Sequence, residues 1–205
     1  MGIMRIAAAS IIDLYTRHAN TWVRARQQET AFYERSWFEK FCSLIPSGST
    51  VLDLGCGPGA PLAAYLAARG YSVTGVDSSP VMASLFQKAL PAQQILVADM
   101  RQLALGRLFA GLLAWDSFFH LTHDDQRLMF GVFRAHAAPR AALMFTSGPA
   151  HGEAMGELGG EPLYHASLDP DEYRALLKQH GFDVIAMVAQ DPTCRGRTVW
   201  LAQLA

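Results

Sequence analysis

Glycines and acids in the first half of the chain have the types and spacing of a ligand site. The segment Val51-Leu-Asp-Leu-Gly-Cys-Gly-Pro-Gly59 places glycines at 55, 57 and 59 between a β-rich run and a helical run. Because glycine has no Cβ, a ligand can approach this backbone closely, and the start of the helix offers free N–H groups. Asp77 ends the next β-rich run, where a carboxylate can accept hydrogen bonds from both hydroxyls of a ribose. These residues predict a site for a ligand that contains a ribose.

Three acids, Asp53, Asp77 and Asp99, lie at or near the ends of three successive β-rich runs. The carboxyl ends of parallel strands share one rim of a sheet, and ligands bind at that rim. Any one of these acids could instead be a turn former or a helix cap. In combination with the glycine loop, the three acids favour a binding site.

Two histidines are candidates for acid–base chemistry. His120 follows shortly after the fourth β-rich run, and His165 lies near the end of a glycine-rich stretch at 147–168. Histidine titrates near neutral pH and can accept a proton from a reacting group. A purely structural role is the alternative for each of them. His120 and His123 are three residues apart, so their side chains could both face one metal ion. However, His123 is expected to be a solvated or capping residue, and no metal site is predicted.

The scaffold for these residues is an alternation of strands and helices. The first five β-rich runs are expected at 50–54, 72–76, 94–98, 108–114 and 141–146. Helical runs separate them, and this pattern predicts a parallel sheet with helices on both faces. Two further runs, at 182–189 and 198–204, are too close together for a parallel crossover. They are therefore expected to pair antiparallel at one edge of the sheet.

Residues 1–45 are expected to be helical and to form a cap on a domain at 46–205. Tyr15, Trp22 and Arg26 share one face of the first long helix. An amphipathic helix packed on the core is the alternative interpretation of this face. The stretch 147–168 contains five glycines and is expected to be a long loop, which could act as a lid over the site.

Composition narrows the class of protein further. The chain has 205 residues with 17 basic and 18 acidic side chains, so it carries no excess of charge that would attract nucleic acid or an anionic membrane. Its three cysteines are widely spaced and form no disulfide framework or zinc motif, which suits the reducing cytoplasm. No apolar stretch reaches the length of a membrane helix. The sequence contains no signal for an oligomeric state.

The glycine loop and the acids together resemble those of the class I S-adenosylmethionine-dependent methyltransferases. The segment 51–59 resembles the first motif of that family, an acid followed by Gly-x-Gly-x-Gly, and Asp77 stands where its ribose-binding acid lies. Asp99-Met100 stands at the adenine position, and the segment 113–116 at the fourth motif, beside the methionine moiety. The resemblance covers residues 49–205, and the helical N-terminus is similar to the variable cap of small-molecule members.

The resemblance implies an α/β, Rossmann-like fold of seven strands in the order 3-2-1-4-5-7-6, mostly parallel with an antiparallel C-terminal strand. It implies S-adenosylmethionine as cofactor and methyl transfer to a small-molecule acceptor whose identity the sequence does not give. Cys56 is expected to be chosen for its size and not as a nucleophile. The expected cofactor-binding residues are Tyr15, Asp53, Gly55, Cys56, Gly57, Asp77, Ser78, Asp99, Met100 and Trp115. His120 and His165 are the expected catalytic residues.

Two alternatives to methyl transfer remain at this stage. The pattern Gly55-x-Gly57-x-x-Ala60 also satisfies the fingerprint of a nicotinamide-dinucleotide-binding oxidoreductase. Asp53 and the lack of a second βαβ half with a substrate domain count against that class. A cofactor-binding module without chemistry is the other alternative.

Overall fold

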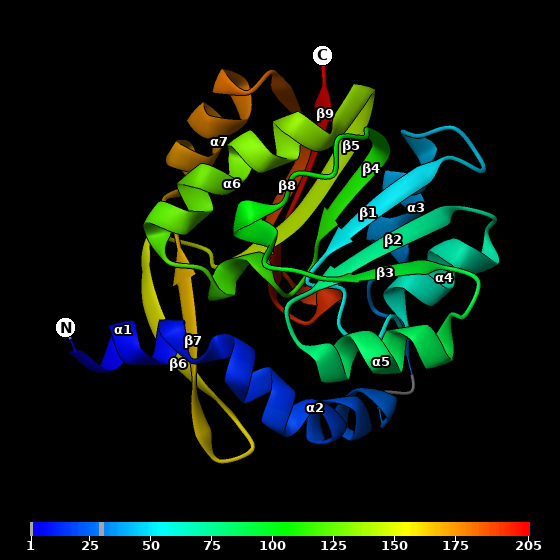
Figure 1. The fold of residues 1–205 in the computed structure, drawn as a ribbon. Helices are drawn as coiled ribbons and strands as arrows, with labels where there is room; N and C mark the ends of the chain where they lie inside the picture. The colour runs from blue at the N-terminus through cyan, green and yellow to red at the C-terminus, as the bar shows by residue number, and fades with distance from the viewer. Residues whose placement is uncertain (1, 29–30) are drawn as a thin grey trace.

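The computed structural model describes residues 2–28 and 31–205. A seven-stranded sheet forms its centre, in the order β3-β2-β1-β4-β5-β9-β8 (Figure 1). The first five of its strands along the chain are parallel, and β9 runs antiparallel between β5 and β8. The predicted fold class and strand order are therefore confirmed. The strands are β1 Thr50–Leu54, β2 Ser72–Asp77, β3 Gln94–Val97, β4 Phe109–Ala114, β5 Ala137–Ser147, β8 Phe182–Asp191 and β9 Arg197–Leu204.

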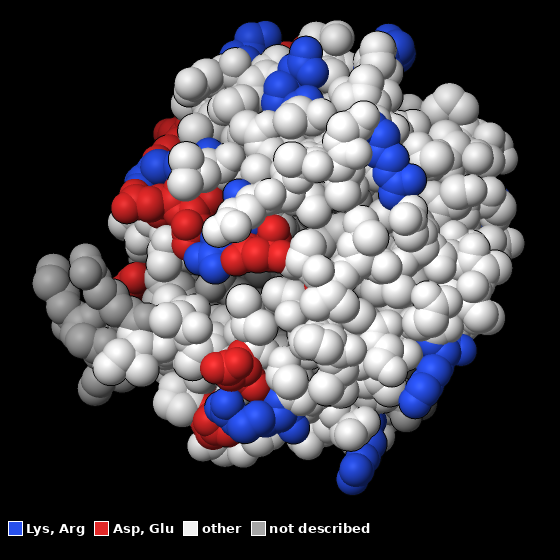
Figure 2. Space-filling view, in the orientation of Figure 1, with Lys and Arg blue, Asp and Glu red and all other residues white. Residues whose placement is uncertain are grey.

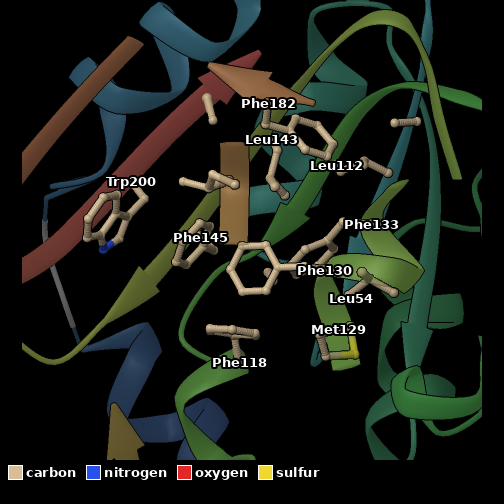
Figure 3. Close-up of a cluster of buried hydrophobic side chains, with 14 of the residues drawn as sticks. Leu54, Leu112, Phe118, Met129, Phe130, Phe133, Leu143, Phe145, Phe182 and Trp200 are labelled. Carbon is tan, nitrogen blue, oxygen red and sulfur yellow. The ribbon is translucent and has the colours of Figure 1, made fainter. Parts of the chain in front are cut away.

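Helices cover both faces of the sheet because successive side chains of a buried strand point to opposite faces. In β1, Val51 packs with Trp37, Phe41 and Leu66 on one face, while Leu52 packs on the other. The second face carries a cluster of aromatic rings that joins the sheet to α6 and α7 (Figure 3). The helices are α3 Arg35–Ser43, α4 Leu62–Ala68, α5 Pro80–Ala89, α6 His123–His136 and α7 Pro170–Gln179.

Three of the helices begin at residues whose side chains cap them. Ser79 caps α5 by accepting a hydrogen bond from the Met82 amide, with Pro80 in the first turn. Thr122 caps α6 and Asp169 caps α7 in the same way. Each cap satisfies an N–H group that the first turn of a helix leaves without a partner. The caps also fix the direction in which each chain segment leaves the rim of the sheet.

The N-terminal segment is helical, as predicted. It contains α1 Gly2–Ala9, α2 Ile11–Gln27 and α3. Only α1 and α2 lie outside the sandwich of sheet and helices, and α2 runs beside α5 (Figure 1). In contrast, Trp37 and Phe41 of α3 are fully buried in the main core. No helix in the described part of the chain is long and apolar enough to cross a membrane.

The stretch 147–168 is not the irregular loop that was expected. It forms a β-hairpin of β6 Gly152–Leu158 and β7 Glu161–Ser167, which pair antiparallel as a separate small sheet. Gly159 and Gly160 make its turn with φ values of +62° and +84°, the left-handed conformation that a two-residue hairpin turn requires. Tyr164 and Ala166 are buried against Ala7, so the hairpin and α1 support each other.

Candidate functional site

A cavity of about 280 Å³ lies at the carboxyl ends of β1, β2 and β4. The strand register brings these ends together, because Leu54 pairs with Val76 and Asp53 pairs with Leu113. The face of α2 that carries Tyr15, Trp22 and Arg26 lines the opposite wall. The cavity is therefore formed by the predicted sheet rim and closed by the N-terminal helix.

The glycine loop adopts a conformation that only glycine tolerates well. Gly55 has φ +72°, and a Cβ there would lie 2.3 Å from the Cβ of Ser117. Gly57 has φ +54°, and a Cβ there would meet no atom within 4 Å, because this residue borders the open cavity. The amides of Gly55 and Cys56 donate to the carbonyl of Val76 at 2.7 and 3.1 Å, which holds the loop against the end of β2. Cys56 is partly buried, and burial raises the pKa of its thiol well above the usual value, so the thiol is not an activated nucleophile.

Asp77 is fixed between the glycine loop and the start of α5. Its carboxylate accepts one hydrogen bond from the Gly57 amide and another from the Ser79 amide, each at 2.8 Å. Burial raises the pKa of this carboxyl group, and the two amides oppose the shift by stabilising the ionised form. Asp77 and Ser78 both line the cavity. A carboxylate held in this way presents its remaining lone pairs in a defined direction.

Asp53 is buried beneath the cavity, with 2% of its surface exposed. Its Oδ2 atom has no hydrogen-bond partner among the described residues. Burial, together with the charge of Asp77, raises its pKa to about 7. An unpartnered buried carboxylate is costly, and a bound cation would relieve that cost. Asp53 therefore marks the place in the cavity that best suits a positively charged group.

Asp99 lies at the other end of the cavity, after β3. Its carboxylate binds Arg101, with Nη2 to Oδ2 at 2.6 Å, and it caps a short 3₁₀ helix through the Arg101 amide. These contacts hold the pKa of Asp99 below its usual range. Arg101 also reaches Asp125 on α6 at 3.1 Å. Asp99, Met100 and Arg101 all line the cavity.

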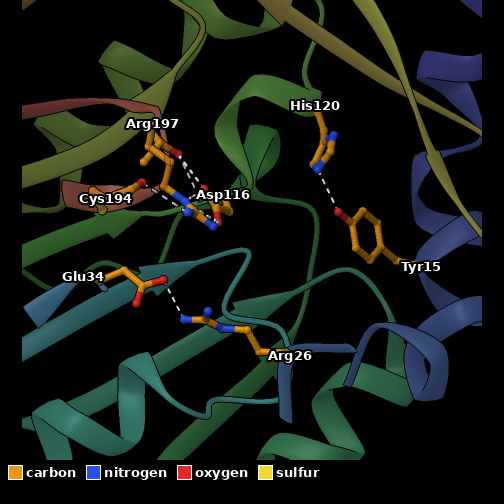
Figure 4. A network of polar contacts seen from close by, with 8 residues as sticks. Tyr15, Arg26, Glu34, Asp116, His120, Cys194 and Arg197 are labelled. Carbon is orange, nitrogen blue, oxygen red and sulfur yellow. Dashed lines mark hydrogen bonds and ion pairs between the residues drawn. The ribbon is translucent and has the colours of Figure 1, made fainter. Parts of the chain in front are cut away.

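Trp115 and Asp116 follow β4 at the centre of the rim. Trp115 is 3% exposed, and its Nε1 donor has no partner within the described structure. Asp116 has φ +48°, and Arg197 from β9 binds both of its carboxylate oxygens (Figure 4). Both residues line the cavity, next to the paired side chains of Arg26 and Glu34. Sequence reasoning missed Glu34 and Arg197, because neither lies in a motif and each is placed by a partner elsewhere in the fold.

His120 lines the cavity and is 6% exposed. The Tyr15 hydroxyl lies 2.8 Å from its Nε2 atom (Figure 4). On the other side of the ring, the Tyr164 carbonyl oxygen lies 2.8 Å from its Nδ1 atom. His165 does not line the cavity. It packs behind His120, with ring centres 4.9 Å apart. The two candidate histidines therefore lie together, but only His120 borders the space where a ligand can bind.

His123, three residues after His120, makes contacts that hold two parts of the fold together. The Nε2 atom of His123 lies 3.2 Å from the Gly152 carbonyl and 3.1 Å from the Ser167 carbonyl, so this residue ties α6 to the hairpin. Its ring stacks on His151. The expectation of a solvated or capping His123 was wrong. No group of three or more metal-binding side chains was found among the residues that the structure describes.

The comparisons with known proteins agree with this geometry. Residues 51–140 match the family model described as "Methyltransferase domain". A Bacillus subtilis protein described as "Putative methyltransferase YqeM" is 33% identical over 116 residues, which is 53% of this chain and 46% of that protein. The chain thus spans less than half the length of this curated relative.

Two solved structures share the fold over most of the chain. One is CalS10, an amino pentose methyltransferase from Micromonospora echinaspora with bound S-adenosylmethionine; it has a TM-score of 0.72 and 19% identity, over 90% of this chain and 97% of that one. The other is the 1,6-didemethyltoxoflavin-N1-methyltransferase of Burkholderia thailandensis, with a TM-score of 0.74 and 18% identity, over 97% and 88%. The chain therefore has the fold of these S-adenosylmethionine-dependent methyltransferases, and its residues 51–140 match the methyltransferase-domain model. The resemblance stated from the motifs is confirmed.

Proposed function

We propose that this protein transfers a methyl group from S-adenosylmethionine to a small-molecule acceptor. The observation that carries the proposal is the buried, unpartnered carboxylate oxygen of Asp53 beside the glycine loop. A dinucleotide would bring the negative charges of a pyrophosphate to this loop, where Asp53 would repel them. S-adenosylmethionine carries a cationic ammonium and a cationic sulfonium, which a carboxylate at this position attracts.

The residues of the cavity fit this cofactor from end to end. Asp77 would accept hydrogen bonds from the ribose hydroxyls, because its carboxylate is already oriented by two amides. Met100 would lie against the adenine near Asp99, and Trp115 would cover the methionine moiety, with Asp53 serving the ammonium. Gly57 leaves the room that this close approach needs.

The cofactor supplies the methyl group on a sulfonium, an electrophile that needs no further activation. The protein contributes alignment and the exclusion of water. Tyr15 and Trp22 on α2 cover the cavity opposite the sheet rim, so the reacting groups would be held away from solvent. Asp116, clamped by Arg197, adds a fixed negative charge to the wall that faces Tyr15.

A small acceptor suits this site better than a macromolecule. The cavity is closed by α2, and the face of the molecule drawn in Figure 2 carries both acidic and basic side chains, with no broad basic patch. With 17 basic and 18 acidic residues, the chain carries no excess of positive charge that would attract a nucleic-acid backbone. The two solved relatives are described as methyltransferases of an amino pentose and of 1,6-didemethyltoxoflavin, both small molecules. With its free thiols, the protein would act in the cytoplasm.

Isothermal titration tests the proposal. S-adenosylmethionine and S-adenosylhomocysteine should bind with micromolar or tighter affinity, and NADH should not bind. Asp53→Asn should weaken S-adenosylmethionine binding, whereas Asp183→Asn, an exposed acid on β8 far from the cavity, should leave it unchanged. NADH binding without S-adenosylhomocysteine binding would contradict the proposal.

A further inference from the structure

We propose that Tyr15 and His120 form a proton relay that serves a neutral acceptor that must lose a proton when it is methylated. Such an acceptor is a hydroxyl or a neutral azole ring that carries an N–H group, and not an alkylammonium ion. This inference rests on the methyl transfer proposed above. It adds the chemical class of the acceptor and a second role for Tyr15, beyond covering the cofactor.

Hydrogen bonding fixes the direction of the relay. The Tyr164 carbonyl can only accept a hydrogen bond, so the Nδ1 atom of His120, 2.8 Å away, carries the ring proton. The Nε2 atom then has a free lone pair and must accept. The Tyr15 hydroxyl, 2.8 Å from Nε2, therefore donates its proton to His120. Figure 4 shows the two side chains reaching toward each other from α2 and from the segment after β4.

The donating hydroxyl of Tyr15 keeps lone pairs on its oxygen. Both Tyr15 and His120 line the cavity, together with Asp116 and Trp115 at the centre of the rim. A ligand with an O–H or N–H group can therefore donate a hydrogen bond to the Tyr15 oxygen. The two hydrogen bonds then run in the same direction: the ligand donates to Tyr15, and Tyr15 donates to His120.

The surroundings keep both members of the pair neutral. Three titratable groups face His120: Tyr15 on α2, His165 on β7, and Asp116 on the segment after β4 that also carries His120. Burial lowers its pKa to about 4, and the hydrogen bond to Tyr164 and the charge of Asp116 only partly oppose this. Burial and the charges of Asp116 and Asp77 raise the pKa of Tyr15. Near pH 7 the site therefore holds a phenol and a neutral imidazole, with no tyrosinate and no imidazolium.

This electrostatic state selects among acceptors. An alkylammonium with a pKa of about 10.4 would have to lose a proton before it could attack, and a base whose conjugate acid has a pKa near 4 cannot take it. A neutral hydroxyl already has a free lone pair, and a neutral azole such as pyrazole has one on its unprotonated ring nitrogen. When its lone pair bonds to the methyl carbon, the carbon–sulfur bond breaks with its electrons left on sulfur. The acceptor proton then passes to the Tyr15 oxygen as the Tyr15 proton passes to Nε2 of His120.

The experiment combines paired acceptors with matched Tyr→Phe variants. Phenol, benzyl alcohol and pyrazole serve as neutral probes and benzylamine as the ammonium probe, and formation of S-adenosylhomocysteine is followed. Tyr15→Phe removes the relay oxygen. Tyr71→Phe is the control, because its hydroxyl also makes a single hydrogen bond, to the Cys42 carbonyl, outside the cavity. Wild type should methylate neutral probes in preference to benzylamine, and Tyr15→Phe should lower kcat by about 10²-fold or more while Tyr71→Phe does not.

Two readouts do not depend on turnover. Nitrogen-15 NMR of the histidines should show His120 protonated at Nδ1 and not titrating between pH 5.5 and 8, with the Nε2 resonance altered in Tyr15→Phe. If no probe is methylated, the affinity of each probe for the complex of the protein with S-adenosylhomocysteine tests the relay instead. Neutral probes should bind at least about tenfold more tightly than benzylamine, and Tyr15→Phe should remove that preference.

Four results would overturn the relay: preferential methylation or binding of benzylamine, no binding of any neutral probe, a Tyr15→Phe variant with wild-type kcat, or a His120 protonated at Nε2. Failure of the proposed function looks different, because S-adenosylhomocysteine itself would then not bind. A Tyr15→Phe variant that binds S-adenosylhomocysteine within a few-fold of wild type shows that α2 still closes over the cavity.

Discussion

Arg197 binds both carboxylate oxygens of Asp116, 81 residues earlier in the chain: its Nε atom lies 2.9 Å from Oδ1, and its Nη2 atom lies 2.6 Å from Oδ2. The pair joins the antiparallel strand β9 to the segment that leaves β4. Asp116 has φ +48°, a conformation that costs free energy for any residue other than glycine. The ion pair holds this conformation and so positions the carboxylate in the wall of the cavity.

Arg197→Gln should therefore destabilise the protein by about 1.5–3 kcal/mol, the range for hydrogen bonds to a charged group. Both side chains are less than a third exposed, so solvent screens the pair only in part. Lys178→Gln is the control, since the pair of Lys178 with Asp183 is largely exposed and should contribute less than about 1 kcal/mol. Denaturant unfolding measures both changes. Equal effects of the two substitutions would show that the Arg197 pair has no special role.

Binding of S-adenosylmethionine should strengthen as pH rises through about 7. The pKa of Asp53 is raised to about 7, so its carboxyl group is mostly neutral at pH 5.5 and mostly ionised at pH 8. A cationic ligand group prefers the ionised form. Titration calorimetry between these pH values should show the increase in wild type, and Asp53→Asn should abolish it. A pH-independent affinity in wild type would contradict the role of Asp53.

The raised pKa of Asp53 has the opposite consequence for the stability of the ligand-free protein, which should fall as the pH rises. A folded-state pKa above the unfolded value means that Asp53 contributes stability below pH 4, and that this contribution is lost as pH rises through about 7. Asp53→Asn removes the ionisation and keeps the shape of the side chain. The variant should therefore gain stability relative to wild type between pH 6 and 8. Thermal unfolding without ligand, measured across this range, checks the direction.

Asp77→Asn should weaken both ligand binding and the ligand-free fold. Losing charged hydrogen bonds to the ribose should reduce affinity for S-adenosylhomocysteine by roughly 10- to 150-fold, since about 1.4 kcal/mol is tenfold. The carboxylate also accepts from the Gly57 and Ser79 amides, and an amide side chain has one acceptor oxygen in place of two. Calorimetry and thermal unfolding measure the two effects. Normal affinity with a large loss of stability would make Asp77 a structural residue only.

Alanine substitutions in the hairpin turn should separate backbone strain from steric overlap. Gly159 and Gly160 both have positive φ, so each Ala variant should lose about 1–2 kcal/mol. A Cβ at Gly159 would also lie 2.2 Å from Nδ1 of His18, whereas one at Gly160 meets nothing within 4 Å. Gly159→Ala should therefore be the more destabilising variant and should increase proteolysis between β6 and β7. Identical behaviour of the two variants would show that His18 moves aside freely.

The alternation of strands and helices and the glycine loop could be predicted because each depends on local signals, whereas the strand order was implied by the family resemblance. Strands alternate with helices, caps stand before helices, and glycines stand where the chain must pass a ligand closely. The hairpin at 152–167 was missed because its five glycines indicated a loop, although Gly159-Gly160 between two short runs is a hairpin signal.

The residues that complete the cavity wall depend on contacts that no sequence pattern contains. Glu34 is 1% exposed and pairs with Arg26, and Arg197 reaches Asp116 from the last strand. His165 was expected beside the acceptor but lies behind His120, because β7 pairs with β6 and turns its ring toward Phe119. Such placements depend on tertiary packing and not on spacing along the chain.

A crystal structure of the protein with S-adenosylhomocysteine tests the central claim most directly. We predict that the nucleoside lies in the cavity at the ends of β1, β2 and β4, with both ribose hydroxyls within hydrogen-bond distance of the Asp77 carboxylate. The sulfur atom should face the space bordered by Tyr15, His120 and Asp116. A ligand bound elsewhere, or one whose ribose makes no contact with Asp77, would contradict the account.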